Sequence, residues 1–484
     1  MRSSHNIMLE TPSLNTYPLI LRVVVLIALA VVTYRFTKKG FHNGILLGLI
    51  TGASPIVLFR DLPGLPIISM DRVVWPIVLG VFLIKRSRNE TERLRLDLIE
   101  RSLLAFMAVM LISMIAHGTY VSTGGEWSLF IVLRGFVFPS MAYFMVRRAA
   151  AKPSNLHSFI VGLGYFGLYL AVTGLLEVFH IDQLIFPQFV VNPKIGIHFG
   201  HARGIFVNAS VLGLALATAL PFLVWLFFHD RAPRRYLWAF AAVVSALPLI
   251  YTFQRAAWLS ALLAMGVTAV AWPKRRLILT WGLMFAVVCG FWLGSEALMK
   301  RLESRTGNTS TIEYRLAHIE RGWAMFRENP VVGVGINRYN VEVEKYTSST
   351  RNLKDLSHAH NTWITLLAEL GLIGFVAYVI PFILVLSKCL LLYLRYPRHR
   401  AFLGILAGIT LGFLMMSVSI DLRTDLYSHT FLFTFWAMIL GTMRRPEVSR
   451  EAMIVNPRRS NSQSVAFNRS ARAAAPLQYR PRWP

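Results

Sequence analysis

The sequence is poor in charged residues, and most of all in acidic ones. Only 15% of its 484 residues are charged, whereas 55% are hydrophobic and the mean hydropathy is +0.52. A soluble domain has about 25% charged residues, so this composition excludes a water-soluble globule. Apolar runs of roughly the 17–25 residues that cross a bilayer recur along the chain. They predict an all-α polytopic membrane protein, because backbone polar groups in lipid must be satisfied within helices.

Cysteine is also scarce. The two cysteines, Cys289 and Cys389, lie in separate apolar runs. They give no disulfide framework, and the redox compartment therefore does not follow from the sequence. The first residues lack the basic start and the small-residue cleavage site of a signal peptide, so we expect the first apolar run to remain as a span.

The apolar runs predict a transmembrane bundle of about twelve or thirteen spans, because one of them is short. They are 18–35, 42–59, 70–84 (the short run), 102–117, 128–146, 158–179, 205–228, 236–253, 256–272, 276–298, 372–394, 401–419 and 429–443.

Basic residues set the expected orientation. The formal net charge is +26, with 50 Lys and Arg against 24 Asp and Glu. In a membrane protein the positive-inside rule accounts for most of this excess, so we expect no nucleic-acid partner. Connections rich in Lys and Arg alternate with the others, which places them all in the cytoplasm. The periplasmic connections are then 60–71, 117–127, 180–204, 299–371 and 420–428.

This pattern divides the chain into four parts. Residues 1–298 form the first ten spans, 299–371 a large periplasmic loop, 372–443 the last spans, and 444–484 a basic tail. The tail has no hydrophobic period and is expected to be disordered and cytoplasmic. It is either a tether to anionic membrane lipid or an end without a specific role.

The large loop is not of low complexity. Residues 310–328 have apolar side chains at helical spacing and predict a helix that ends before Pro330. Gly333 and Gly335 follow, and their spacing favours a turn over a phosphate-binding loop. The polar face of the predicted helix carries Arg315, His318 and Arg321.

Two histidines lie just before a predicted span, in "HAHNTWITLLAELGLIG" at 358–374. His358 and His360 would share one face of a strand, as a pair of metal ligands does, and Asp355 is the nearby carboxylate. Two alternatives to a metal site remain: the histidines lie on the surface without a role, or they carry out acid–base chemistry. Histidine suits that chemistry because its proton exchanges near neutral pH.

Three arginines lie at or within membrane depth. Arg134 is inside an apolar run, and Arg203 and Arg255 lie at the expected periplasmic ends of others. A charge inside a bilayer costs at least about 2.5–3.5 kcal/mol and normally faces water or the bundle interior. These side chains either extend to the surface or form a pocket for an anionic headgroup, which the planar guanidinium suits.

The histidine segment resembles a known family. "HN", nine residues, Gly371, two residues and Gly374 match the histidine motif of bacterial O-antigen ligases and related polysaccharide polymerases. "ARGIFVNASVLGLALATALP" and "FQRAAWLSALL" resemble the two arginine-bearing segments of that family. The similarity covers roughly residues 190–420. The residue before Arg255 is Gln254, where the family often has serine, and the basic tail is not a family feature.

The resemblance implies a GT-C-like, inverting glycosyltransferase of the inner membrane, with its active site facing the periplasm. Its donor would be an undecaprenyl-pyrophosphate-linked glycan, with no cofactor and no metal. His360 would be the catalytic base, and the donor pyrophosphate would be bound by Arg203, Arg255 and, less strongly, Arg315. Further candidates for supporting roles are Arg134, His358 and Asn361.

The sequence does not identify the molecule that accepts the glycan. A ligase would use the lipid A core, a polymerase a second lipid-linked glycan, and a protein O-oligosaccharyltransferase a protein hydroxyl, and other polysaccharide-assembly proteins are expected partners. The alternative class is a lipid-linked oligosaccharide flippase. Such transporters have repeats with similar loops in both halves, whereas one loop here is far longer than the rest.

Overall fold

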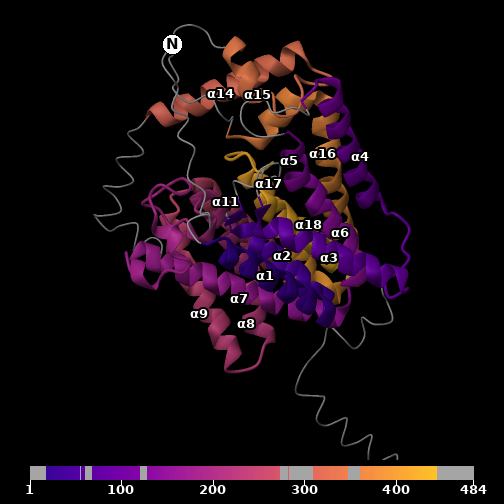
Figure 1. Cartoon of the computed structure of the whole chain (residues 1–484), viewed down its shortest axis with the longest axis vertical. Coiled ribbons are helices and arrows are strands. Elements are labelled where there is room, and N and C mark those ends of the chain that lie inside the picture. The colour runs from indigo at the N-terminus through magenta and orange to yellow at the C-terminus, as the bar shows by residue number, and fades with distance from the viewer. Residues whose placement is uncertain are drawn as a thin grey trace, which may run out of the picture. The chain divides into compact units, whose positions relative to one another are not determined.

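The protein is a helical bundle (Figure 1). The structure, a computed structural model, describes residues 18–54, 56–59, 68–119, 128–272, 282, 309–346, 360–423 and 425–443, with the side chains of 309–314 excluded. Within them, the strands β1 (Val57–Phe59) and β2 (Ile68–Ser69) form a small antiparallel sheet. All other regular elements of the described chain are helical, which confirms the predicted all-α class.

Helices occupy the predicted apolar runs that the structure describes, and the exception is the end of run 42–59, which contains β1. The helices before the large loop are α1 (Leu19–Lys39), α2 (Phe41–Ala53), α3 (Met70–Ser87), α4 (Leu98–Ala116), α5 (Ser128–Val132), α6 (Phe138–Ala149), α7 (Pro153–Val178), α8 (Ala209–His229), α9 (Arg234–Val244), α10 (Ala246–Tyr251) and α11 (Arg255–Ala271). A π-helical turn, η2 (Leu133–Val137), joins α5 to α6, and short 3₁₀ turns are η3 (Asp182–Leu184), η4 (Gln188–Val191) and η5 (Gly204–Phe206).

The later helices are α14 (Thr309–Glu328) and α15 (Tyr339–Glu342) in the large loop, then α16 (Thr362–Arg395), α17 (Arg400–Met416) and α18 (Leu426–Thr442). The 3₁₀ turns η6 (Val343–Tyr346) and η7 (Pro397–His399) lie between them. Among the described residues, 6 helices are long and apolar enough to cross a membrane. The number of twelve or thirteen spans stays a prediction, and run 276–298, apart from residue 282, and the tail lie outside the described residues.

Small residues bring α11 and α17 together, and this packing fixes α11, which begins with Arg255. Gly404, Gly408 and Gly412 repeat every fourth position and so lie on one face of α17. A Cβ on Gly408 would lie 2.4 Å from the carbonyl oxygen of Ala264. The Ser260 hydroxyl donates to the carbonyl of Gly412 over 2.7 Å. In lipid the hydrophobic effect does not drive helices together, so the close packing of small residues drives their association.

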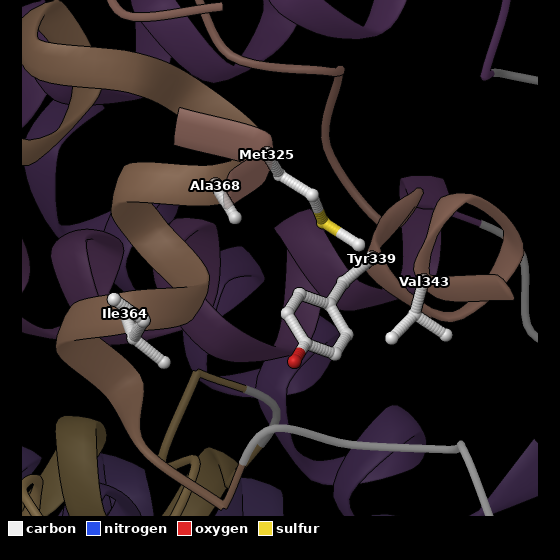
Figure 2. Close-up of a cluster of buried hydrophobic side chains, with 5 residues drawn as sticks. All are labelled: Met325, Tyr339, Val343, Ile364 and Ala368. Carbon is white, nitrogen blue, oxygen red and sulfur yellow. The ribbon is translucent and has the colours of Figure 1, made fainter. Parts of the chain in front are cut away.

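Helix α14 of the large loop packs on the start of α16. Figure 2 shows the contact, in which Met325 and the ring of Tyr339 lie between Val343 on one side and Ile364 and Ala368 on the other. The predicted loop helix is therefore confirmed, and it ends at Glu328.

The buried face of α14 is not its most apolar one. His318 and Arg321 are buried there, whereas Leu316, Ile319 and Trp323 are 54%, 37% and 41% exposed. Gly322 lies on the buried face, where a Cβ would be 2.9 Å from Ile364. Close backbone approach, together with the polar groups, therefore decides which side of α14 packs against the bundle.

Helix α16 changes direction at Gly371, the first glycine of the histidine motif. Gly371 has φ 61° and ψ −162° inside the helix, a conformation that glycine adopts without strain. The freed amides of Leu372 and Ile373 donate to the carbonyls of Pro330 and Val331 over 2.8 and 3.2 Å. The loop thus replaces the hydrogen bonds that the helix loses at its bend.

The glycine-rich segment of the loop is a docking turn. The amides of Val334 and Gly335 donate to the carbonyls of Ala368 and Glu369 over 2.9 Å each. Gly333 has φ 70°, and a Cβ on it would lie 2.3 Å from the carbonyl carbon of Glu369. The predicted turn is confirmed, because these amides bind the protein's own carbonyls and not a phosphate.

We expect Gly333→Ala to lower the melting temperature of the purified protein far more than Gly118→Ala does. Both glycines have positive φ, but a Cβ on Gly118 would have no other atom within 4 Å. The backbone conformation alone costs about 1–2 kcal/mol, whereas the alanine at 333 must also push α16 away from the loop. Equal melting temperatures for the two variants would show that the loop does not dock on α16 in this way.

Candidate functional site

His360 is presented at the beginning of α16. It is exposed, and its φ of 48° lies in the left-handed region, which non-glycine residues seldom adopt. The next residue, Asn361, caps the helix, and its side-chain oxygen accepts from the amides of Trp363 and Ile364 over 2.9 and 3.1 Å. Asn361 is a strong helix N-cap residue, so it fixes the point at which the chain turns and presents the imidazole.

The segment 417–423, between α17 and α18, lies against this turn. The amide of Thr362 donates to the carbonyl of Ser417 over 2.9 Å. Its hydroxyl donates to the carbonyl of Ile420 over 2.9 Å and accepts from the amide of Leu422 over 3.0 Å. These hydrogen bonds join residues that are 60 positions apart in the chain. The junction, at Thr362, lies two residues after His360.

Arg315, on α14, reaches the same segment from the other side. Its guanidinium donates to the Ser419 hydroxyl over 3.0 Å. Burial, and then the charge of Arg255, lower the pKa of Arg315. Arginine nevertheless stays protonated in proteins, so two like charges are held near each other. Such a pair costs free energy unless an anion binds between them.

Arg255 occupies the first turn of α11 and is exposed. The positive end of a helix dipole adds to the charge of a side chain at this position. Thr252 and Tyr251, just before it, hold the loop that carries Arg203, because their carbonyls bind His201 Nδ1 and the amide of Ala202 over 3.0 Å each. The two predicted arginine segments are thus adjacent in the fold.

Arg203 itself is turned into the protein. The residue is 1% exposed, and its guanidinium donates to the carbonyls of Val190, Asn192 and Ile195 over 2.6, 2.7 and 2.7 Å. Its own amide donates to the carboxylate of Glu177 over 3.0 Å. These bonds tie the 190–204 loop together and occupy the planar fork that the sequence suggested for pyrophosphate.

Arg134 lies in the π-helical turn η2, a feature that is frequent at functional sites. It is within electrostatic reach of the partly buried carboxylate of Asp425. Its neighbour Gly135 meets the 417–423 segment, since a Cβ there would lie 1.9 Å from the carbonyl oxygen of Arg423. Arg134 therefore belongs to the surroundings of that segment.

A buried ionic network connects the elements that carry the site. The carboxylate of Glu369, 1% exposed, pairs with the Arg423 guanidinium. It also accepts from the amides of Asn337 and Tyr339 over 2.8 and 3.2 Å. Arg423 pairs in turn with Asp421 over 2.8 Å. The network joins the glycine-rich loop, the start of α16 and the 417–423 segment.

Neither this network nor the contacts of Thr362 were predicted from the sequence. A signal for Glu369 was present, because an acid within "ITLLAELGLIG" is costly in an apolar run unless it has a partner. Arg423 and Asp421 lie in a short connection with little pattern of its own, and only the fold shows that they meet Glu369.

Two predicted positions have a different status. His358 and Asp355 lie outside the described residues, so the pairing of His358 with His360 stays a prediction. Within the described ranges there is no group of three or more His, Cys, Asp or Glu side chains arranged to hold a metal ion.

The fold and this site define a polytopic α-helical membrane protein with a histidine and arginines gathered where its large loop docks. Residues 240–379, from α9 to α16, match the O-antigen ligase family. This match supports the resemblance to O-antigen ligases and related polymerases that the sequence motif carries. A comparison with curated proteins gives no match. The family supports a glycosyltransferase-type role in surface polysaccharide biosynthesis and a multi-pass protein of the inner membrane.

The buried network makes a stability prediction. Glu369→Ala leaves the Arg423 charge without this partner and two amides without an acceptor. We expect a loss of about 3–5 kcal/mol, the usual cost of breaking a buried ion pair from one side, measured as a lower melting temperature in detergent. Lys345→Ala is the matched control, because the lysine side chain is 68% exposed and Glu342 keeps its ion pair with Arg338 when the lysine is removed. This change should alter stability by less than about 1 kcal/mol. Equal melting temperatures would contradict the assignment.

Proposed function

We propose that the protein transfers a glycan from undecaprenyl pyrophosphate to an acceptor hydroxyl at the periplasmic face of the inner membrane. The observation that supports this most is the 417–423 segment, which joins the turn of His360 to Arg315 by hydrogen bonds. Arg255 is within electrostatic reach of Arg315. A base and two fixed positive charges are the groups that this transfer requires.

In this proposal His360 accepts the proton of the acceptor hydroxyl. The oxygen attacks the anomeric carbon of the donor sugar from the face opposite the pyrophosphate. The new C–O bond forms as the bond to the pyrophosphate oxygen breaks, so the anomeric configuration inverts. The electron pair leaves with undecaprenyl pyrophosphate, and the proton stays on the imidazole until solvent removes it.

Arg255 and Arg315 stabilise the charge that develops on the leaving pyrophosphate. Preorganised charges are most effective where charge appears in the transition state, and the cost of holding two arginines near each other is relieved there. They supply the charge that a divalent cation supplies in other phosphate sites, so we propose a metal-independent reaction. Arg203 shapes the adjoining loop, because its guanidinium is already bound to three carbonyls.

The roles of His360 and Arg255 predict activity losses in purified enzyme with a lipid-linked glycan. His360→Ala should lower turnover by roughly 10²–10⁴, the usual contribution of a positioned base. Arg255→Ala should also lower it strongly, and Arg255→Lys should recover only part, because a point charge does not reproduce the guanidinium fork. Arg327→Ala, an exposed arginine of α14, is the control. Wild-type turnover by His360→Ala would refute the proposed mechanism.

The acceptor is decided in the same assay. With donor alone, a polymerase lengthens the lipid-linked glycan, whereas a ligase forms product only when lipid A core is added. A peptide acceptor tests protein glycosylation, and movement of donor across a vesicle without any new glycosidic bond would indicate a flippase.

The periplasmic position of the large loop is a separate prediction. In a chain whose native cysteines are replaced, Lys345→Cys in that loop should react with an impermeant thiol reagent in intact spheroplasts. Asn89→Cys, in the basic connection after α3, should react only after lysis. Both positions are exposed. The reverse labelling pattern would place His360 in the cytoplasm and exclude the proposed reaction.

A further inference from the structure

Neither the family match nor the sequence motif assigns a role to Thr362. It is the first residue of α16 and is fully buried. Its hydroxyl donates to one backbone group of the 417–423 segment, the carbonyl of Ile420, and accepts from another, the amide of Leu422. With its own amide bound to Ser417, Thr362 holds the segment at three points.

The held segment connects the two halves of the site. On one side Thr362 is two residues from His360, in a helix start that Asn361 caps. On the other side Ser419 accepts the hydrogen bond of Arg315 over 3.0 Å. The relative position of the base and this arginine therefore depends on how the segment lies against Thr362.

We infer that Thr362 is a positioning residue that fixes His360 relative to Arg315. The inference depends on the proposed function, because it assigns those two residues to one reaction. Thr362 is buried, and its proposed role involves no contact with the donor or the acceptor. Its effect is on geometry, and a misplacement of about 1 Å can lower the rate of a reaction about a hundredfold.

The chain offers well-matched variants. Thr362→Val keeps the shape of the side chain but removes the hydroxyl that donates and accepts, whereas Thr362→Ser keeps the hydroxyl. Thr365 is the control, because it is equally buried and one turn further along α16. Its hydroxyl donates to Asn361 of its own helix over 2.7 Å and not to the 417–423 segment.

The experiment measures initial rates against donor concentration for these purified variants. We expect Thr362→Val to lower kcat roughly ten- to hundredfold with little change in the KM for the donor. Thr362→Ser should restore most of the rate, and Thr365→Val should stay close to wild type. A merely structural role would lower the amount of folded enzyme without this separation of kcat from KM.

Several results would overturn the inference. These are a wild-type kcat for Thr362→Val, a failure of Thr362→Ser to recover, or an equal loss for Thr365→Val. If Thr362→Val does not accumulate in the membrane, Ser419→Ala decides, since it breaks the same connection at its partly exposed end. It should lower turnover in the same direction, and an unchanged rate would refute the bridge.

The proposed function and this inference fail in different ways. If His360→Ala retains wild-type turnover, the proposed chemistry is wrong whatever Thr362 does. If His360→Ala is inactive and Thr362→Val is normal, the chemistry stands and only the positioning role is lost.

Discussion

The buried carboxylate of Glu369 is the interaction on which this end of the bundle depends. A charge removed from water is tolerated only when other groups replace the solvent. Here Arg423 and the amides of Asn337 and Tyr339 do so. These partners come from two different parts of the chain, so satisfying one carboxylate brings the large loop and the 417–423 segment onto the start of α16. The docking of the loop also explains the kink at Gly371, because carbonyl groups of the loop accept hydrogen bonds from the amides that the bend frees.

Four arginines around the site divide into two groups by what their guanidinium groups touch. Arg203 is satisfied within its own loop, and Arg423 within the ionic network. Arg315 and Arg255 remain near each other, with one hydrogen bond from Arg315 to a serine. Charge type alone does not separate these groups in a sequence, whereas in the structure Arg203 and Arg423 are buried and Arg255 and Arg315 are exposed. The distinction lies in whether the fold supplies acceptors, and it is the reason why the proposed function assigns the anion to Arg315 and Arg255.

The sequence was informative where the pattern is local or set by lipid. Hydropathy located the apolar helices and Pro330 the end of α14, because each depends on neighbouring residues. The buried face of α14 was not predictable in the same way, since its contact with Ile364 depends on Gly322 and not on the apolar stripe. His360, Arg255 and Arg315 were selected as candidates one by one, through the family motif, the membrane charge rule and the polar face of the loop helix, and their roles stay a prediction. Thr362 and Glu369 were missed, since their partners lie far away in the chain.

The central claim is that the imidazole of His360 removes a proton from the acceptor at a site prepared by the docked loop. Chemical rescue tests it most directly. His360→Gly leaves space for a free imidazole, and the purified variant is assayed for glycan transfer with increasing imidazole. The account predicts almost no turnover without imidazole and a rate that rises with its concentration. Full turnover by His360→Gly in the absence of imidazole would contradict it.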